Sequence, residues 1–125
     1  MAVDYSIIIP AYNESTWLPE TLKIIHQAMA TIPLQGEVIV TDNNSSDNTA
    51  QLAKQQGATV VFEPVNQISR ARNAGARAAV GKYLVFVDAD THISPDILKT
   101  ALDNLQSGNC CGGGAVVAFD HDITA

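Results

Sequence analysis

The chain alternates between short apolar segments and longer segments with helical spacing, and this alternation constrains its fold more than any other feature. The strand-like segments are residues 6–10, 37–41, 59–62, 83–87 and 115–119. The helix-like segments are residues 17–30, 48–56, 68–80 and 94–107. This βαβαβαβαβ order with short connections predicts an α/β fold: a mostly parallel sheet with helices on both faces.

Local signals mark where several of these elements begin and end. Pro19 is tolerated only in the first turn of a helix, so the first helix should start just before it. Ser94 followed by Pro95 is a strong helix start, because serine can cap the helix and proline fits its first position. Residues 112–114 are all glycine, and we expect a loop there.

Composition excludes several classes of function. Seven basic residues against thirteen acidic ones give a net charge of −6, which disfavours nucleic acid or an anionic membrane as partner. No apolar run among the 125 residues is long enough to be a signal peptide or a membrane span. The two cysteines, Cys110 and Cys111, are adjacent, and a disulfide between neighbours would be strained. We therefore expect a reducing compartment, most simply the cytoplasm.

Polar residues gather directly after three of the predicted strands. They follow the first strand at 10–14, the second at 42–47 and the fourth at 88–90. In parallel α/β sheets, ligands bind outside the carboxyl ends of the strands. The sequence thus predicts a polar site at this edge. Arg72 and Asn73 lie on the helix after the third strand, and an arginine near this edge can pair with a diphosphate or hold the carboxylates in place.

Asp88 and Asp90 give the sharpest chemical hypothesis. Two carboxylates two residues apart repel each other unless a cation or hydrogen bonds offset their charge. Oxygen ligands beside a phosphate-bearing substrate suit Mg²⁺ or Mn²⁺. Alone, such a pair is often only a turn, but its place at the predicted ligand edge favours a metal.

Other common sites are absent from the sequence. There is neither a Walker A phosphate loop nor a G-x-G-x-x-G after the first strand, and no G-x-S-x-G elbow for a serine hydrolase.

Four segments together resemble the family 2 glycosyltransferases of the GT-A fold. They are Ser-Ile-Ile-Ile-Pro-Ala-Tyr-Asn-Glu at 6–14, Val-Thr-Asp-Asn-Asn-Ser-Ser-Asp at 40–47, Arg-Asn-Ala-Gly at 72–75 and Val-Asp-Ala-Asp at 87–90. They occur in the family's order and at fitting separations. The resemblance implies a nucleotide-diphospho-sugar donor, a divalent metal, and transfer of the sugar with inversion at its anomeric carbon.

The resemblance also implies roles for single residues. The loop with Pro10, Tyr12, Asn13 and Glu14 would line the nucleoside, with Glu14 near the ribose. Asp42 would read the base, typically uracil, and Arg72 and Asn73 would lie near the nucleotide. Asp88 would face the ribose and the metal, and Asp90 would be the direct metal ligand. These are the expected donor and metal residues.

The sequence departs from the family pattern in two places. The second motif usually continues with another aspartate, whereas Asn43 and Asn44 follow Asp42 here. Family members also continue well beyond this length, and their later half builds the acceptor site and supplies the general base. No carboxylate stands out for that role apart from Asp120 and Asp122, and we assign it to neither. We expect residues 1–125 to be one nucleotide-sugar-binding domain, incomplete at its carboxyl end, whose catalytic base lies elsewhere.

Two other hypotheses remain open at this point. The chain could be a nucleotide-binding or partner-binding module without catalysis, which the missing base favours and the intact Asp88/Asp90 pair opposes. A sugar-nucleotide pyrophosphorylase shares the broad architecture but needs a glycine-rich basic loop after the first strand. Residues 10–14 contain no glycine, lysine or arginine. The sugar, the acceptor and the oligomeric state have no readable signal.

Overall fold

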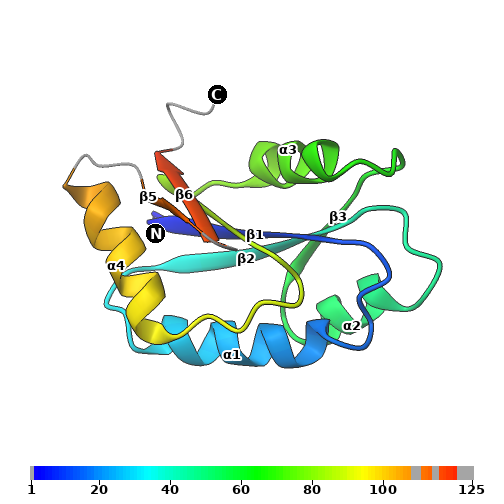
Figure 1. The fold of residues 1–125 in the computed structure, drawn as a ribbon, viewed down its shortest axis with the longest axis horizontal. Helices are drawn as coiled ribbons and strands as arrows, with labels where there is room; N and C mark the ends of the chain where they lie inside the picture. The colour runs from blue at the N-terminus through cyan, green and yellow to red at the C-terminus, as the bar shows by residue number, and fades with distance from the viewer. Residues whose placement is uncertain (1, 108–110, 114–115, 121–125) are drawn as a thin grey trace.

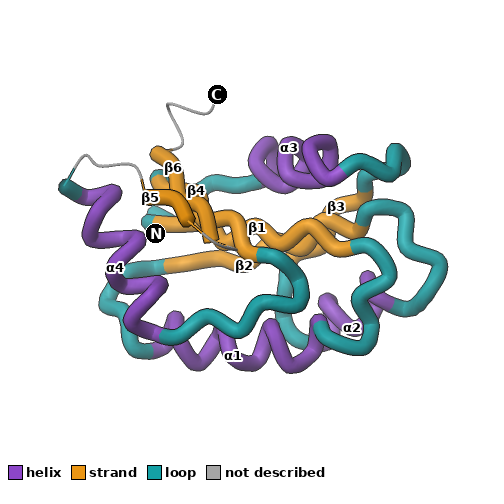
Figure 2. Tube along the Cα trace, viewed as in Figure 1, coloured by secondary structure: helices purple, strands orange, loops and turns teal. Residues whose placement is uncertain are grey.

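The computed structural model describes residues 2–107, 111–113 and 116–120, which form a six-stranded sheet with helices on both faces (Figures 1 and 2). The strands are β1 (Tyr5–Ala11), β2 (Gly36–Asp42), β3 (Thr59–Phe62), β4 (Tyr83–Val87), β5 (Cys111–Gly113) and β6 (Val116–Asp120). The helices are α1 (Leu18–Ala30), α2 (Thr49–Gln55), α3 (Ile68–Ala78) and α4 (Pro95–Gln106). Across the described residues, no helix has both the length and the apolar character that a bilayer span requires.

The sheet confirms the predicted α/β class. Its strand order is β3-β2-β1-β4-β6-β5, and the first four of these strands are parallel. Because the chain moves outward from β1 to β3 and then returns to the other side of β1 with β4, the strand order reverses next to β1. The carboxyl ends of β1 and β4 therefore flank the place where such sheets bind ligands.

The far edge of the sheet differs from the prediction. β6 pairs antiparallel with β4, and β5 pairs antiparallel with β6. The predicted loop at 112–114 is wrong for Gly112 and Gly113, which lie in β5. Glycine offers a strand ladder the same backbone donor and acceptor as any other residue, and a strand of three residues is too short to show a period. Gly114 and Cys110 lie outside the described residues.

Side chains of β1 alternate between two apolar clusters. Ile7 and Ile9 are buried in the larger cluster with Leu22 of α1, which also contains residues of α2 and α4. Ile8 belongs to the smaller cluster with Ala79, at the end of α3. Figure 1 shows α3 on one side of the sheet and α1, α2 and α4 on the other. A strand buried on both faces reads as a continuous apolar run, as observed for β1.

The predicted helix starts are confirmed. Pro19 occupies the first turn of α1. Ser94 caps α4: its Oγ accepts a hydrogen bond from the backbone N–H of Ile97 at 3.2 Å. These helix starts set where the polypeptide leaves the loops that follow β1 and β4, and those loops carry polar residues of the pocket.

Candidate functional site

A pocket of about 200 Å³ lies at the carboxyl edge of the parallel strands. Its walls come from the ends of β1, β2 and β4 and from the start of α3, as the strand order predicts. The residues that line it are Pro10, Ala11, Tyr12, Glu14, Asn43, Ile68, Asp88, Ala89 and Asp90. Five of these nine were predicted as site residues: Pro10, Tyr12, Glu14, Asp88 and Asp90.

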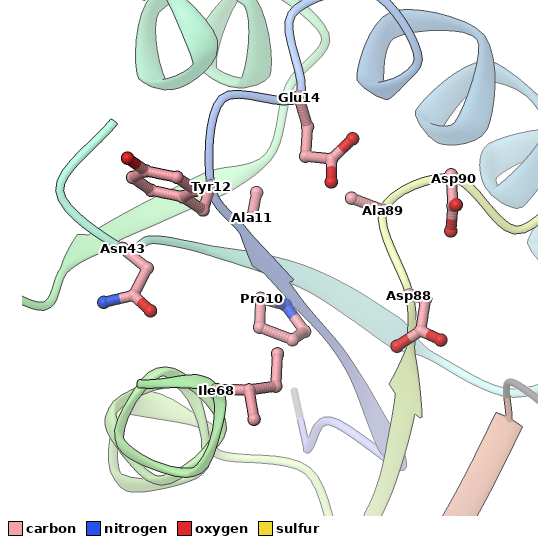
Figure 3. Close-up of a pocket in the computed structure, with 9 residues that line it drawn as sticks. All are labelled: Pro10, Ala11, Tyr12, Glu14, Asn43, Ile68, Asp88, Ala89 and Asp90. Carbon is pink, nitrogen blue, oxygen red and sulfur yellow. The ribbon is translucent and has the colours of Figure 1, made fainter. Parts of the chain in front are cut away.

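The pocket has two chemically different sides (Figure 3). Tyr12, Asn43 and Ile68 lie on one side, and the three carboxylates, Glu14, Asp88 and Asp90, lie on the other, with Pro10 and Ala11 between them. Tyr12 and Ile68 are about half exposed, at 53% and 54%. Large apolar side chains this open to solvent offer surfaces on which a planar ligand can pack.

Asn43 has a fixed orientation at the end of β2. Its side-chain Nδ2 donates to the backbone carbonyls of Glu63 at 3.1 Å and Val65 at 2.6 Å. Its own backbone N–H donates to the carbonyl of Ala11 at 2.8 Å. With both amide protons used, the remaining side-chain group is Oδ1, which accepts from no described residue and points toward Pro10 and Ile68 in Figure 3. Asn43 thus presents a hydrogen-bond acceptor to the pocket.

Asp42 is buried beside the pocket and is not part of its lining. Its Oδ1 accepts a hydrogen bond from the backbone N–H of Ser45 at 3.0 Å, which closes the turn after β2. The period of two along a strand explains this placement, because Val38 and Val40 face the helix α1 side and Asp42 has the same parity. The structure thus places Asn43, and not Asp42, against the pocket.

The loop after β1 is joined to the loop after β2 by hydrogen bonds in both directions, and we call this set of contacts the loop clamp. The backbone N–H of Asn13 donates to Ser45 Oγ at 2.9 Å. In return, Asn13 Oδ1 accepts from the N–H and the hydroxyl of Ser46, at 2.8 and 3.2 Å. Asn13 has a φ of +52°, a left-handed conformation that asparagine tolerates better than most residues. Its side chain binds protein and does not line the pocket.

A second set of contacts extends the loop clamp to the start of α2. The backbone N–H of Glu14 donates to Thr49 Oγ1 at 3.0 Å, and that of Ser15 donates to Asp47 Oδ2 at 3.3 Å. Asp47 Oδ1 accepts from the Thr49 N–H at 3.0 Å and from its hydroxyl. Burial acts to raise the pKa of Asp47, but hydrogen bonds from Thr49 and Ser15 outweigh it and lower the pKa. The ionised carboxylate therefore strengthens the clamp.

The acidic side of the pocket gathers three carboxylates, Glu14, Asp88 and Asp90. Burial raises the pKa of Glu14, and the nearby carboxylates Asp90, Asp47 and Asp88 raise it further. Among the described residues, no group of three or more His, Cys, Asp or Glu side chains forms a ready-made metal cage. Mg²⁺ and Mn²⁺ do not need one, since they are commonly held by one or two carboxylates together with substrate phosphates. Asp88 and Asp90 fit that pattern.

Arg72 reaches this acidic side from α3. One of its guanidinium nitrogens lies 3.9 Å from Asp88 Oδ1, and both side chains are nearly half exposed. At this distance the pair is a loose ion pair, and the guanidinium is free to move toward an anionic ligand. Asn73, the next residue, is exposed and does not line the pocket. The structure therefore places Arg72 near the site and Asn73 outside the pocket wall.

Four pocket residues were not predicted: Ala11, Asn43, Ile68 and Ala89. A signal existed for Asn43. Side chains alternate along β2, so Asp42 shares the face of the sheet on which Val38 and Val40 pack, and Asn43 lies on the other face. Ala11 and Ala89 contribute backbone and a methyl group, for which a sequence carries no signal. Ile68 is exposed at the first position of α3, where an apolar residue has no core to enter.

The fold, with a pocket at the carboxyl edge of its parallel strands, is the one seen in GT-A glycosyltransferases. A mannosyltransferase from Pyrobaculum calidifontis, PcManGT, solved in complex with GDP-Man and Mn²⁺, has the same fold with a TM-score of 0.82 at 22% identity. The match covers 98% of this chain and 46% of that one. TarS from S. aureus, residues 1–349 in complex with UDP, matches with a TM-score of 0.68 at 26% identity, over 86% of this chain and 33% of that one.

Residues 6–123 match the family model for glycosyl transferase family 2, and the chain belongs to this family. The uncharacterized glycosyltransferase Rv0539 of Mycobacterium tuberculosis is 34% identical over 103 residues, 82% of this chain and 44% of the relative. The undecaprenyl-phosphate 4-deoxy-4-formamido-L-arabinose transferase of Klebsiella pneumoniae is 30% identical over 115 residues, 82% of this chain and 34% of the relative. The chain thus spans less than half the length of these curated relatives.

Proposed function

We propose that the pocket binds the nucleoside diphosphate of a UDP-sugar, and that the protein transfers the sugar to an acceptor with inversion and with the help of a divalent metal. The observation that carries this proposal is the division of one pocket into a side with an exposed aromatic ring and a fixed acceptor, and a side with three carboxylates. TarS, which resembles this chain at 26% identity, has been solved with UDP, and this supports a uridine donor.

In this proposal Asn43 recognises the nucleobase of the donor. Uracil carries an N3–H that can donate to an acceptor, and Asn43 Oδ1 is the acceptor that the pocket offers. Tyr12 and Ile68 would then pack against the two faces of the ring. This role was expected for Asp42, whose Oδ1 is bonded to Ser45 instead. Guanine also has a ring N–H in a comparable position, whereas cytosine does not, so the series UDP, GDP and CDP tests the assignment.

The diphosphate and the metal belong to the acidic side. Asp88 and Asp90 would hold Mg²⁺ or Mn²⁺ jointly with the diphosphate oxygens, because the carboxylates alone would repel a diphosphate. The metal would supply charge compensation to the departing diphosphate. Arg72, loosely paired with Asp88, is placed to contact the same anion. Glu14 lies on the acidic side of the pocket, and the ribose would lie beside it.

The reaction proposed is a single displacement at the anomeric carbon. The bond between that carbon and the diphosphate oxygen breaks, a bond to an acceptor hydroxyl oxygen forms, and the hydroxyl proton passes to a base. The pocket's own carboxylates are all engaged on the donor side in this arrangement, so we assign the base to none of them. If no transfer accompanies binding, the alternative of a non-catalytic nucleotide-binding module applies.

Calorimetric titration with UDP, GDP and CDP, each with and without Mn²⁺, tests the proposal. We expect UDP to bind one to one with a Kd in the micromolar to millimolar range, corresponding to about 4–8 kcal/mol. CDP should bind at least about tenfold more weakly than UDP, because it would leave the Asn43 acceptor unpaired. Removal of Mn²⁺ should weaken binding strongly. A folded chain that binds none of the three nucleotides contradicts the proposal, and preferential binding of GDP contradicts the uridine assignment.

A second experiment separates the transferase from the non-catalytic module. The protein is incubated with UDP-glucose, UDP-GlcNAc or UDP-galactose and Mn²⁺, and released UDP is measured with and without a mixture of sugar and polyprenyl-phosphate acceptors. Acceptor-dependent release of UDP supports transfer. Tight UDP binding with no release from any donor supports the non-catalytic alternative.

A further inference from the structure

A buried hydrogen bond ties helix α1 to the segment between the two aspartates. Thr21 Oγ1 donates to the backbone carbonyl of Ala89 at 2.7 Å. Thr21 is fully buried and Ala89 is 3% exposed, so water does not compete for this bond. The two residues are 68 positions apart in the sequence, and Ala89 stands directly between Asp88 and Asp90.

The segment at 88–90 needs such a contact because it has left the sheet. The ladder between β4 and β1 ends at Phe86, and the ladder between β4 and β6 ends at Val87. Beyond these residues a buried carbonyl has to find another partner or lose the free energy of a hydrogen bond. The Asp88 carbonyl accepts from the Thr91 N–H at 3.0 Å, which forms a turn, and the Ala89 carbonyl accepts from Thr21.

The hydroxyl of Thr21 has a local alternative that it does not use. Serine and threonine in helices often donate to the carbonyl one turn earlier in their own helix. Here the Trp17 carbonyl accepts the backbone N–H of Thr21, and the hydroxyl donates to Ala89. Because α1 is packed into the larger apolar cluster through Leu18, Leu22 and Ile25, it is a rigid support for this contact.

We propose that Thr21 is a positioning residue: its bond to the Ala89 carbonyl holds the 88–90 segment so that the Asp88 and Asp90 carboxylates face the pocket together. This inference rests on the proposed function, because it concerns the two carboxylates that would share a metal with the donor diphosphate. Thr21 itself does not line the pocket. Its effect on the positions of the two carboxylates would pass through the backbone of Ala89. Ala89 is buried and stands between Asp88 and Asp90 in the sequence.

Thr21→Val is the direct test, because valine has nearly the same shape and lacks the hydroxyl. The chain offers a matched control in Thr41 of β2, which is also fully buried and whose Oγ1 has no hydrogen-bond partner among the described residues. Thr41→Val makes the same chemical change without breaking a bond. Thr21→Ser keeps the hydroxyl and should preserve the bond to Ala89.

The measurement is the Kd for UDP with and without Mn²⁺, by calorimetry, on the wild type and the three variants well below their melting temperatures. We expect Thr21→Val to weaken UDP binding about tenfold in the presence of Mn²⁺ and to change it little in its absence. A purely structural role would change both values alike. Thr21→Ser and Thr41→Val should keep the wild-type dependence on Mn²⁺. Should Thr21→Val fail to fold, Thr21→Ala removes the hydroxyl without adding a methyl group against the carbonyl.

The outcomes separate the inference from the function on which it rests. A wild type that binds no nucleotide contradicts the proposed function, and the role of Thr21 with it. A wild type with Mn²⁺-dependent binding, together with a folded Thr21→Val variant that has the same dependence, overturns the inference alone. Equal losses in Thr21→Val and Thr41→Val would also overturn it, because removal of any buried hydroxyl would then suffice.

Discussion

The two sides of the pocket are held in place in different ways. On the side of the proposed base, the loops after β1 and β2 bond to each other through the loop clamp, and Asn43 is fixed by two backbone carbonyls. On the acidic side, the 88–90 segment has its own turn and the bond from Thr21, and Asp88 has a loose ion pair with Arg72 at 3.9 Å. We infer that the side proposed for the nucleobase, with Tyr12, Asn43 and Ile68, is formed before ligand binds. The acidic side would be completed by metal and diphosphate. We call the first of these the base side.

The largest expected effect comes from removing a carboxylate on the acidic side. Asp90→Asn should weaken Mn²⁺-dependent UDP binding by about 100-fold or more, since even the outer partners of metal ligands are worth about 10- to 100-fold. Asp90 is exposed and its loss leaves no cavity, so the melting temperature should change little. The measurement is calorimetric titration with UDP and Mn²⁺.

A matched control for this change lies in the first turn of α4. Asp96→Asn removes the same charge from an exposed position outside the pocket and should leave UDP binding as it is. Equal affinities for Asp90→Asn and Asp96→Asn would show that net charge alone matters and that the acidic side holds no metal.

Breaking the loop clamp should have the next largest effect. Asn13→Gly keeps the left-handed backbone accessible but removes the acceptor of the two hydrogen bonds from Ser46. We expect UDP affinity to fall about tenfold with and without Mn²⁺, because Tyr12 and Glu14 flank Asn13 and would lose their fixed position. This pattern differs from that of Thr21→Val, which should act only in the presence of metal.

Asn13→Asp provides the conservative comparison. A carboxylate can accept from the Ser46 N–H and hydroxyl in the same way, and aspartate also tolerates a positive φ. Its affinity for UDP should stay close to that of the wild type. If glycine and aspartate variants bind equally well, the clamp does not position the base side.

Much of this architecture could be predicted from the sequence, and the exceptions have physical reasons. The apolar patterns located five strands, β1 to β4 and β6, and all four helices, because burial on one or both faces imposes a pattern. β5 was missed since its ladder uses backbone groups that glycine supplies without any pattern. The motifs predicted a site at the carboxyl edge of the sheet, where the pocket lies. The choice between Asp42 and Asn43, however, depends on which way each side chain points.

The contacts that hold the site together have no sequence signal at all. The bond from Thr21 to Ala89, the bond from Asn13 to Ser45 and the bond from Ser46 to Asn13 join residues far apart in the chain. Each depends on the packing of whole helices and strands. From the sequence, Thr21 is indistinguishable from any other buried residue of an amphipathic helix. Only the structure shows that its hydroxyl donates a hydrogen bond to the Ala89 carbonyl. The sequence could thus indicate five residues that line the pocket, whereas it gave no sign of the residues that hold them in position.

Glu14 should give a smaller effect whose sign depends on pH. Its pKa is raised by burial and by Asp90, Asp47 and Asp88, so the folded state holds its proton more tightly than the unfolded state does. The contribution of Glu14 to stability therefore falls as pH rises from about 4.5 through its raised pKa. In metal-free buffer, Glu14→Gln should remove this loss and raise the melting temperature at pH 7 by about 1–2 °C. At pH 4, where the wild-type side chain is protonated, the two proteins should melt together.

The same variant tests whether the acidic side accepts a cation. Mn²⁺ near Asp88 and Asp90 would offset their charge, lower the pKa of Glu14 and reduce the advantage of glutamine. Thermal melts of both proteins across pH 4–8, with and without Mn²⁺, make the comparison. A difference in melting temperature between the wild type and Glu14→Gln that does not change with pH in this range would contradict the inferred repulsion among these carboxylates.

Arg72→Ala should have the smallest effect on the free protein. The ion pair with Asp88 is 3.9 Å long and nearly half exposed, so its loss should cost less than about 0.5 kcal/mol of stability. With Mn²⁺ present, however, UDP affinity should fall about threefold to tenfold, because in the proposed complex the guanidinium would be bonded to the diphosphate. Arg77→Ala, an exposed change in the last turn of the same helix, should alter neither quantity. If Arg72→Ala destabilises the nucleotide-free protein by more than 1–2 kcal/mol, the acidic side is already rigid before ligand binds, and the contrast between the two sides of the pocket disappears.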